Sequence, residues 1–395
     1  MQYDHITTDR QLQELCRDLA DTSYIGFDTE FVSEDTYFPE LCLVQVAADN
    51  ILAVIDPKDI SDMSPFWDVL SSGSHLTIAH AAREEFRFCR LAVQRRPANL
   101  FDVQLAAGLV GIEYPASYGK LLSKLLGVKL AKGETRTDWR RRPLSDKQIE
   151  YALQDVIYLK DIHSKLESSL RELGRLEWLD EEMAAWQDDM EAAESQERWR
   201  RVSGISGLPE KALVIVRELW RWREEVAQSK NRPPRRVLRD DLIVELARRG
   251  KSDVKQIRAI RGLERSVAKN QVPALSDAIE RALELPRAEW PKPHRPKPSP
   301  RATLLGQFIS TALSSICRSQ QLAPSIVGTV QDVRDLVTYH VFADEVGELD
   351  EVPALAKGWR ASIVGRTIED LLEGKAVIRI NDPKADEPLA IEPRR

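Results

Sequence analysis

The sequence has few cysteines, no long hydrophobic run and no excess of positive charge. Its four cysteines are scattered over 395 residues without a Cys-x-x-Cys pair, which argues against a disulfide framework or a structural zinc site. No apolar run approaches the ~20 residues of a membrane-spanning helix. The first residues lack the basic and apolar segments of a secretory signal. These absences predict a soluble, cytoplasmic protein without a membrane partner.

The length and the charge leave the class of protein open. A chain of 395 residues is long enough for two or three domains with sizeable cores. Its composition, 43% hydrophobic and 30% charged, is that of an ordinary globular protein. The net charge of −6 does not indicate nucleic-acid binding, but overall charge is a poor guide where basic patches are local.

The stretch at 24–31, Tyr-Ile-Gly-Phe-Asp-Thr-Glu-Phe, predicts a buried strand that carries two acids. Second neighbours on a strand point to the same side, so Asp28 and Glu30 project together. Two adjacent carboxylates in an apolar setting repel unless a cation lies between them. A hard divalent metal with oxygen ligands, Mg²⁺ or Mn²⁺, is therefore the expected occupant.

The Asp-x-Glu pattern is weak on its own, because it occurs three times in the chain. The pairs Asp180/Glu182 and Asp189/Glu191 lie in an acidic stretch that predicts a solvated helical connector. Only the pair at 28 and 30 is flanked by a hydrophobic run, which favours a site there.

Strand and helix signals alternate along the first 110 residues. Apolar runs predict strands at 41–47, 51–55, 76–79 and 100–102, and periodic spacing predicts helices at 12–19, 66–70, 82–91 and 104–110. The short Asp49-Asn50 link makes the strands around it an antiparallel hairpin. This order predicts a mixed α/β sheet covered by helices.

A capping box at 145–148 begins a helix with apolar spacing through Ile162. Tyr151 and Asp155 are four residues apart and therefore share one face of it. Such a pair can hold a metal and orient a water or phosphate, but taken alone it is more often a plain surface pair.

A third candidate follows the strand at 76–79. His80 ends that strand, and Glu84 and Glu85 enter the next helix. Strand ends that lead into helices often carry sites in α/β folds. Acids at a helix start also suit the helix dipole, and His80 fits a packed, hydrogen-bonded histidine.

Together, the motif at 27–31, the His80-Ala81 pair before Glu85, and Tyr151-x-x-x-Asp155 resemble the DEDDy 3′–5′ exonucleases, and most closely the bacterial ribonuclease D family. Stretches at 55–57 and 137–144 are similar to that family as well. The resemblance implies an RNase H-like exonuclease fold with two divalent metal ions.

The resemblance also implies roles for the acids. Asp28 would bridge both metals, Glu30 and Asp155 would complete the nucleophile-side ion, and Glu85 would hold the other through water. Tyr151 would position the attacking water, since a phenol of pKa ~10 is a poor base. The family has an aspartate where this chain has Glu85. Asp102 is the nearest later aspartate, but its surroundings match a different stretch of the family.

The second half has helical spacing and a local basic cluster. Helices are predicted at 209–226, 238–248, 254–260 and 270–285, in a pattern that resembles the helicase-and-RNase-D C-terminal (HRDC) domain. Trp220 and Trp222 are expected in its core and rim. Five basic residues without an intervening acid predict RNA contact: Lys230, Arg232, Arg235, Arg236 and Arg239. A solvated loop is the alternative.

The predicted domains are an exonuclease domain at 1–200, an HRDC domain at 203–288 and a second HRDC-like helical domain at 302–395 that ends in a possible hairpin. Residues 286–301 hold six prolines and read as a stiff linker.

The predicted activity is metal-dependent 3′–5′ hydrolysis of RNA ends, releasing nucleoside 5′-monophosphates from structured RNAs such as tRNA precursors, without an obligate protein partner. Two alternatives remain. A DNA exonuclease would use the same acids, since nothing in these motifs reads a 2′-hydroxyl. A non-catalytic RNA-binding protein on an exonuclease scaffold is the other.

Overall fold

The computed structural model describes residues 2–130, 137–263, 269–293, 300–343, 352–385 and 387–394. Contacts divide the chain into two units. The first comprises residues 1–30, 42–189 and 297–395, and the second comprises residues 31–41 and 190–296. The domain boundaries expected from the sequence remain a prediction about modules of the chain.

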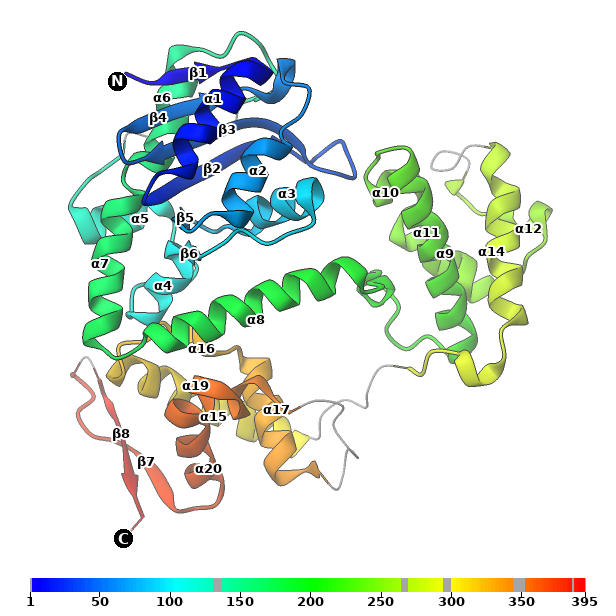
Figure 1. Ribbon diagram of the computed structural model, residues 1–395. Helices are drawn as coiled ribbons and strands as arrows, with labels where there is room; N and C mark the ends of the chain where they lie inside the picture. Colours follow the sequence, from blue (N-terminus) through cyan, green and yellow to red (C-terminus); the bar gives the residue numbers. More distant parts are fainter. Residues whose placement is uncertain are drawn as a thin grey trace. The chain divides into compact units, whose positions relative to one another are not determined.

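A six-stranded mixed sheet forms the centre of the first unit (Figure 1). Its strands lie in the order β1-β4-β3-β2-β5-β6. β1–β4, β2–β5 and β5–β6 pair parallel, whereas β3–β4 pair antiparallel. The strands are β1 (Asp4–Ile6), β2 (Tyr24–Val32), β3 (Glu40–Ala48), β4 (Ile51–Ile55), β5 (Leu76–Ala79) and β6 (Leu100–Asp102). The predicted mixed sheet and its hairpin are confirmed.

Helices of this sheet-containing part follow the predicted order. They are α1 (Asp9–Ala20), α2 (Ser64–Ser72), α3 (Arg83–Val93), α4 (Val103–Leu109), α5 (Tyr118–Leu121), α6 (Asp146–Ile157), α7 (Leu159–Glu172) and α8 (Leu176–Ser195). The two faces of β2 meet different helices. Phe27 packs edge-on against Phe66 and Trp67 of α2, with ring centroids 6.2 and 6.3 Å away. On the other face, a Cβ added at Gly26 would lie 3.3 Å from Leu159 Cβ in α7.

The helix predicted to run from 145 through Ile162 is two helices. Ser145 and Gln148 form the expected capping box at its start. The prediction of continuity is wrong, because Tyr158 leaves helical geometry at φ −103° and ψ 0° between α6 and α7. Apolar spacing continues through the break, so periodicity alone gave no sign of it.

A helical group at the C-terminal end of the chain also belongs to the first unit. It contains α15 (Pro300–Ser319), α16 (Pro324–Val327), α17 (Val330–Val341), α19 (Gly358–Arg360) and α20 (Arg366–Leu372), and then the hairpin β7 (Ala376–Ile380) and β8 (Leu389–Pro393). The antiparallel β7–β8 pair confirms the expected hairpin. Among the described residues, no helix combines the length and apolarity needed to cross a membrane.

Helix α8 lies between the sheet-containing part and this C-terminal group (Figure 1). Phe86 of α3 meets Trp186 of α8 with ring centroids 5.4 Å apart. On the C-terminal side, Arg360 donates to both oxygens of Glu182 at 2.7 and 2.8 Å, and Trp178 stacks on Trp359 at 5.2 Å. The reading of Glu182 as solvated is therefore wrong, because its side chain is only 14% exposed.

Backbone contacts tie the same C-terminal group to the end of α4. The Arg175 guanidinium donates to Leu109 O at 2.7 Å and to Gln321 O at 2.9 Å. Gly111 has a φ of +77°, and a Cβ there would lie 2.8 Å from the Gln321 backbone. Both the conformation and the close approach therefore require glycine at this position.

The second unit contains a helical module with its own core. Its helices are α9 (Glu210–Ser229), α10 (Pro234–Val237), α11 (Asp240–Arg249), α12 (Val254–Arg258) and α14 (Val272–Glu284). Trp222 is 6% exposed in that core and Trp220 packs against it, as expected. Residues 294–299 of the predicted linker lie outside the described residues.

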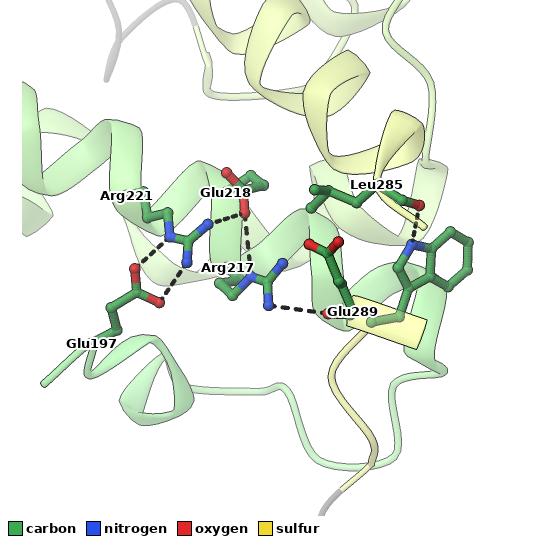
Figure 2. A network of polar contacts seen from close by, with 7 residues as sticks. Glu197, Arg217, Glu218, Arg221, Leu285 and Glu289 are labelled. Carbon is green, nitrogen blue, oxygen red and sulfur yellow. Dashed lines mark hydrogen bonds and ion pairs between the residues drawn. The ribbon is translucent and has the colours of Figure 1, made fainter. Parts of the chain in front are cut away.

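Polar contacts fasten both flanks of the module to α9 (Figure 2). Arg221 binds Glu197, which precedes the module, with Nη2 2.9 Å from Oε2. Arg221 and Arg217 share Glu218, and Arg217 donates to Glu289 O at 3.2 Å. Figure 2 also shows the Trp290 indole donating to Leu285 O, at 3.0 Å.

The two helical groups share a constant offset of 90 residues. Helix α9 at 210–229 corresponds to α15 at 300–319, and α10 at 234–237 corresponds to α16 at 324–327. The next helices begin at Asp240 and Val330, which keeps the offset. A residue with positive φ follows two positions after the end of each long helix, Asn231 at 44° and Gln321 at 52°. This match supports the prediction of a second HRDC-like copy.

We expect Glu182→Ala to loosen the C-terminal group, because Arg360 would lose two charge-assisted hydrogen bonds in a partly buried setting. The cost should be about 1–3 kcal/mol. Hydrogen exchange should speed up in α19 and α20 but not in α1. Glu177→Ala, an exposed acid of the same helix, is the control. Equal protection in both variants would contradict the expectation.

Candidate active site

The register of the sheet puts Asp28 beside the end of β5. Gly26 pairs with Ile78, so Asp28 lies two residues beyond the last pair, next to the chain that continues into His80 and α3. Gly26, Asp28 and Glu30 alternate along β2 and therefore share the face toward the start of α7. Asp155 lies one turn before that point, in α6. Three separate elements thus bring acids to one place.

The turn between β5 and α3 is fixed by Asp102. Its carboxylate accepts hydrogen bonds from Ala81 N at 3.1 Å and Ala82 N at 2.9 Å, and Ala81 has a φ of +57°. Asp102 also caps α4 through Gln104 N at 2.7 Å. His80 Nε2 contacts Ala116 O at 2.8 Å. Asp102 and His80 therefore hold the turn that delivers Glu85.

Glu85 is buried, at 4% exposure, and it accepts a hydrogen bond from the Thr29 hydroxyl at 2.6 Å. Burial raises the pKa of Glu85 to about 7, although this hydrogen bond opposes the rise. Thr29 lies between Asp28 and Glu30 in sequence. The longer acid is thus anchored to the same strand that carries the other two.

Burial raises the pKa values of all four acids, and the charges of the other acids add to the rise at Asp28 and Glu30. Burial, then the charges of Glu85, Asp155 and Glu30, hold the pKa of Asp28 well above its usual range. Burial and the charges of Asp155 and Glu85 raise the pKa of Glu30 to about 8. Burial also raises the pKa of Asp155 to about 7. The charges that act on Asp28 and Glu30 indicate that Glu85 and Asp155 both lie near these two acids.

Tyr151 faces the same group of acids. Burial and the charges of Asp155, Glu30 and Asp28 raise its pKa to about 12. Its ring lies 6.4 Å from that of Trp139, centroid to centroid. Tyr151 therefore stays protonated near neutral pH and can donate a hydrogen bond.

The segment before α6 is pinned to the sheet by Arg142. Its Nη2 donates to Asp56 Oδ1 at 2.8 Å and to Cys42 O at 2.7 Å, and its Nη1 donates to Trp139 O at 2.6 Å. Arg142 and Asp56 lie in the two stretches that carried the family resemblance. Their pairing explains how Trp139 is brought to Tyr151.

Tyr118 is a residue near the site that the sequence did not reveal. It is 8% exposed, its ring lies 5.6 Å from that of His80, and no hydrogen-bond partner of its hydroxyl within the described residues meets ordinary geometry. Burial and the charges of Asp155 and Asp28 raise its pKa. No motif includes this tyrosine. Its position as an aromatic residue next to Gly119 is the only feature of the sequence that could have drawn attention to it.

The donor set fits a hard divalent cation, which the 3′–5′ exonuclease fold implies. Among the described residues, no positive charge contributes to the raised pKa values of these four carboxylates, and oxygen ligands suit Mg²⁺ and Mn²⁺. Within the described part of the chain, no three His, Cys, Asp or Glu side chains are already gathered as a metal-binding group.

The predicted basic cluster lies in the second unit and is partly neutralised. Arg235 pairs with Asp240 at 3.1 Å, Arg239 with Asp241 at 2.8 Å and Arg236 with Asp35 at 2.6 Å. For Lys230 and Arg232, the described residues show no ion pair. RNA contact by the cluster remains a prediction, and these two cations are its strongest members.

Comparisons with known proteins agree with this geometry. A model of the 3′–5′ exonuclease family matches residues 3–171, and a model of the HRDC domain matches residues 212–279. The ribonuclease D of Sphingobium indicum is 32% identical over 383 residues, covering 95% of this chain and 96% of that protein. The chain belongs to the ribonuclease D family. Members of this family are 3′–5′ exoribonucleases, so the predicted enzyme class and fold are confirmed.

Two further relatives match this chain over nearly its whole length and over nearly the whole of their own. The ribonuclease D of Granulibacter bethesdensis is 32% identical, over 95% of this chain and 94% of that protein. The crystal structure of Escherichia coli RNase D has a TM-score of 0.81 and 26% identity, covering 95% of this chain and 99% of that one. The similarity therefore extends through both helical groups.

We expect metal binding to release protons near neutral pH. Glu30, Glu85 and Asp155 have pKa values of about 7 to 8 and are partly protonated at pH 7, whereas a cation binds only their ionised forms. Mg²⁺ affinity should therefore rise from pH 6 to 8.5. Calorimetry in two buffers of different ionisation enthalpy should show release of roughly one proton or more at pH 7. Asp146→Asn should behave as wild type, and a pH-independent affinity would refute the linkage.

Proposed function

We propose that this ribonuclease D is a metal-dependent exoribonuclease that releases nucleoside 5′-monophosphates from RNA 3′ ends. The observation that carries the proposal is that four acids from β2, α3 and α6 are buried with raised pKa values, and that the charges of Glu85 and Asp155 act on both Asp28 and Glu30. A site with that much uncompensated negative charge suits a divalent cation and a phosphodiester.

The residues divide into two groups around the acid-bearing strand. Asp28, Glu30 and Asp155 would hold one Mg²⁺ or Mn²⁺ ion, and Asp28 with Glu85 would hold a second. Bound metal supplies an activated water and neutralises charge on the leaving 3′ oxygen. Thr29 positions Glu85 by its hydrogen bond, which limits where the longer side chain can reach.

Tyr151 acts as a hydrogen-bond donor in this proposal. With a pKa of about 12 it does not serve as a base near pH 7. Its place on the face shared with Asp155 lets the phenol orient the attacking water or a phosphate oxygen. Contact with Trp139 restricts the ring and so lowers the entropic cost of that orientation.

The proposed substrates are structured RNAs such as tRNA precursors, acted on in the cytoplasm. The E. coli relative is described as an exoribonuclease involved in structured RNA processing. Lys230 and Arg232 would bind RNA phosphates, with Arg235, Arg236 and Arg239 contributing less because each is ion-paired.

The acids alone do not distinguish RNA from DNA, so the two substrates are compared directly. Oligomers of matched sequence with ribose, deoxyribose, or a single terminal deoxyribose should be degraded at different initial rates. Preference for the all-ribose oligomer is expected from the family. Equal rates on all three would favour a nuclease without sugar selectivity.

Asp28→Asn should reduce hydrolysis at least 10³-fold, about 4 kcal/mol of transition-state stabilisation, because a carboxylate that would hold both ions is lost. RNA binding in EDTA should persist, since the helical modules are unchanged. Rates on a labelled oligomer and binding by fluorescence anisotropy test both points. Asp146→Asn, an exposed aspartate at the start of α6, is the control. Substantial turnover by Asp28→Asn would exclude this site.

The longer acid should favour Mn²⁺, which is less strict about geometry than Mg²⁺. Glu85→Asp should therefore raise the Mg²⁺-supported rate, and Glu85→Gln should cost roughly tenfold, about 1.4 kcal/mol. Glu84→Gln is the matched control, because Glu84 pairs with Arg87 at 3.5 Å. Initial rates of all variants, measured with Mg²⁺ and with Mn²⁺, test these expectations. Loss of activity in Glu84→Gln with normal rates in Glu85→Gln would show that the wrong acid is named.

A further inference from the structure

The turn after α9 contacts a segment that is distant in sequence. We define the docking turn as residues 228–236 and the latch as residues 35–38. The latch lies in residues 31–41, which group with the helical module in the second unit. It follows directly from β2, the strand that carries Asp28 and Glu30.

The side chain of Asn231 binds the latch. Its Oδ1 accepts hydrogen bonds from Tyr37 N at 3.1 Å and from Phe38 N at 3.0 Å. One amide oxygen thus satisfies two consecutive backbone donors that no strand pairs with. A side chain that lacks an acceptor at this position would leave both donors to water.

The Tyr37 side chain adds a second set of contacts. Its hydroxyl accepts from Gln228 Nε2 at 3.0 Å and donates to Glu224. Its ring packs against the buried core of the helical module. Both hydrogen-bonding capacities of the hydroxyl are therefore used, which is what fixes a tyrosine in a docked position.

The ion pair between Arg236 and Asp35 contributes less. Their side chains are 61% and 43% exposed, and exposed pairs are worth only about 0–1 kcal/mol. The specificity of the contact therefore lies in Asn231 and Tyr37 rather than in charge.

The corresponding turn of the C-terminal group also binds a segment from an earlier part of the chain. Gln321 stands 90 residues after Asn231, and both have positive φ. Around Gln321, Arg175 donates to the carbonyl of Gln321 at 2.9 Å and Ala323 N donates to Gly108 O at 2.9 Å. In both helical groups, the turn after the long helix binds a segment from the first 200 residues of the chain.

We propose that the docking turn is a protein-binding surface whose partner is the latch, and that this contact positions long RNA for the exonuclease. Docking of Asn231 immobilises the turn that carries Lys230 and Arg232, and it ties that turn to the chain leaving β2. The role for RNA rests on the proposed function, whereas the contact itself does not. Tyr37 and Asn231 are positioning residues in this scheme.

The test uses the full chain with Asn231→Gly, Asn231→Asp and Gln94→Gly. Glycine removes the acceptor and keeps the positive φ without strain, while aspartate keeps an acceptor oxygen. Gln94, at φ 56°, is a matched control for the backbone change. Hydrogen exchange is followed in the peptide spanning 33–38, together with KM and kcat on a tRNA-sized RNA and on a dinucleotide.

In Asn231→Gly, the latch amides should exchange roughly tenfold faster. KM for the long RNA should rise several-fold, with kcat and dinucleotide hydrolysis unchanged. Asn231→Asp and Gln94→Gly should resemble wild type. Unchanged exchange in Asn231→Gly would overturn the contact, and faster exchange with an unchanged KM would overturn the positioning role. A protected latch in a wild-type protein that degrades no RNA would refute the proposed function and leave the contact standing.

Discussion

Repulsion among carboxylates is the constraint on which the catalytic part of this ribonuclease D depends. Burial raises the pKa values of Glu30, Glu85 and Asp155 to about 7 to 8 and holds that of Asp28 well above its usual range, and nearby like charges add to the rise at Asp28, Glu30 and Glu85. Acids that repel in this way stay adjacent only if other interactions hold their backbones. A fold that accepts this cost gains a site with high intrinsic affinity for cations.

The supporting interactions come from elements that carry no catalytic group. Asp102 fixes the turn before α3, Arg142 ties the segment before α6 to Asp56, and the Ser145 cap sets where α6 begins. Asp102 and Arg142 use charge-assisted hydrogen bonds, which are stronger than neutral ones, whereas the Ser145 cap is neutral and exposed. The acids are thus held in place by neighbouring residues whose own polar groups are hydrogen-bonded. The destabilisation caused by placing the acids close together therefore stays local.

Local patterns predicted most of the fold and paired four of the five proposed catalytic positions, whereas the choice of Glu85 came from the family resemblance. Alternation along β2 placed Asp28 with Glu30, and helical spacing placed Tyr151 with Asp155, since both depend only on backbone period. Contacts across long stretches of chain left no such signal. Thr29 and Glu85 are 56 residues apart, Glu182 and Arg360 are 178 apart, and Tyr37 and Asn231 are 194 apart. These pairings follow from tertiary packing, so Glu182 was misread as solvated and the latch was not foreseen.

The offset of 90 residues between the two helical groups has a consequence for how their sequences can vary. Equal offsets at three successive helix starts mean that no residue has been gained or lost between them, although most side chains differ. Chain length is therefore held more tightly than residue identity. The backbone sets where each turn lies, while side chains such as Asn231 determine which segment the turn binds. Insertions should be tolerated between the two helical groups and should destabilise the protein when they fall within either group.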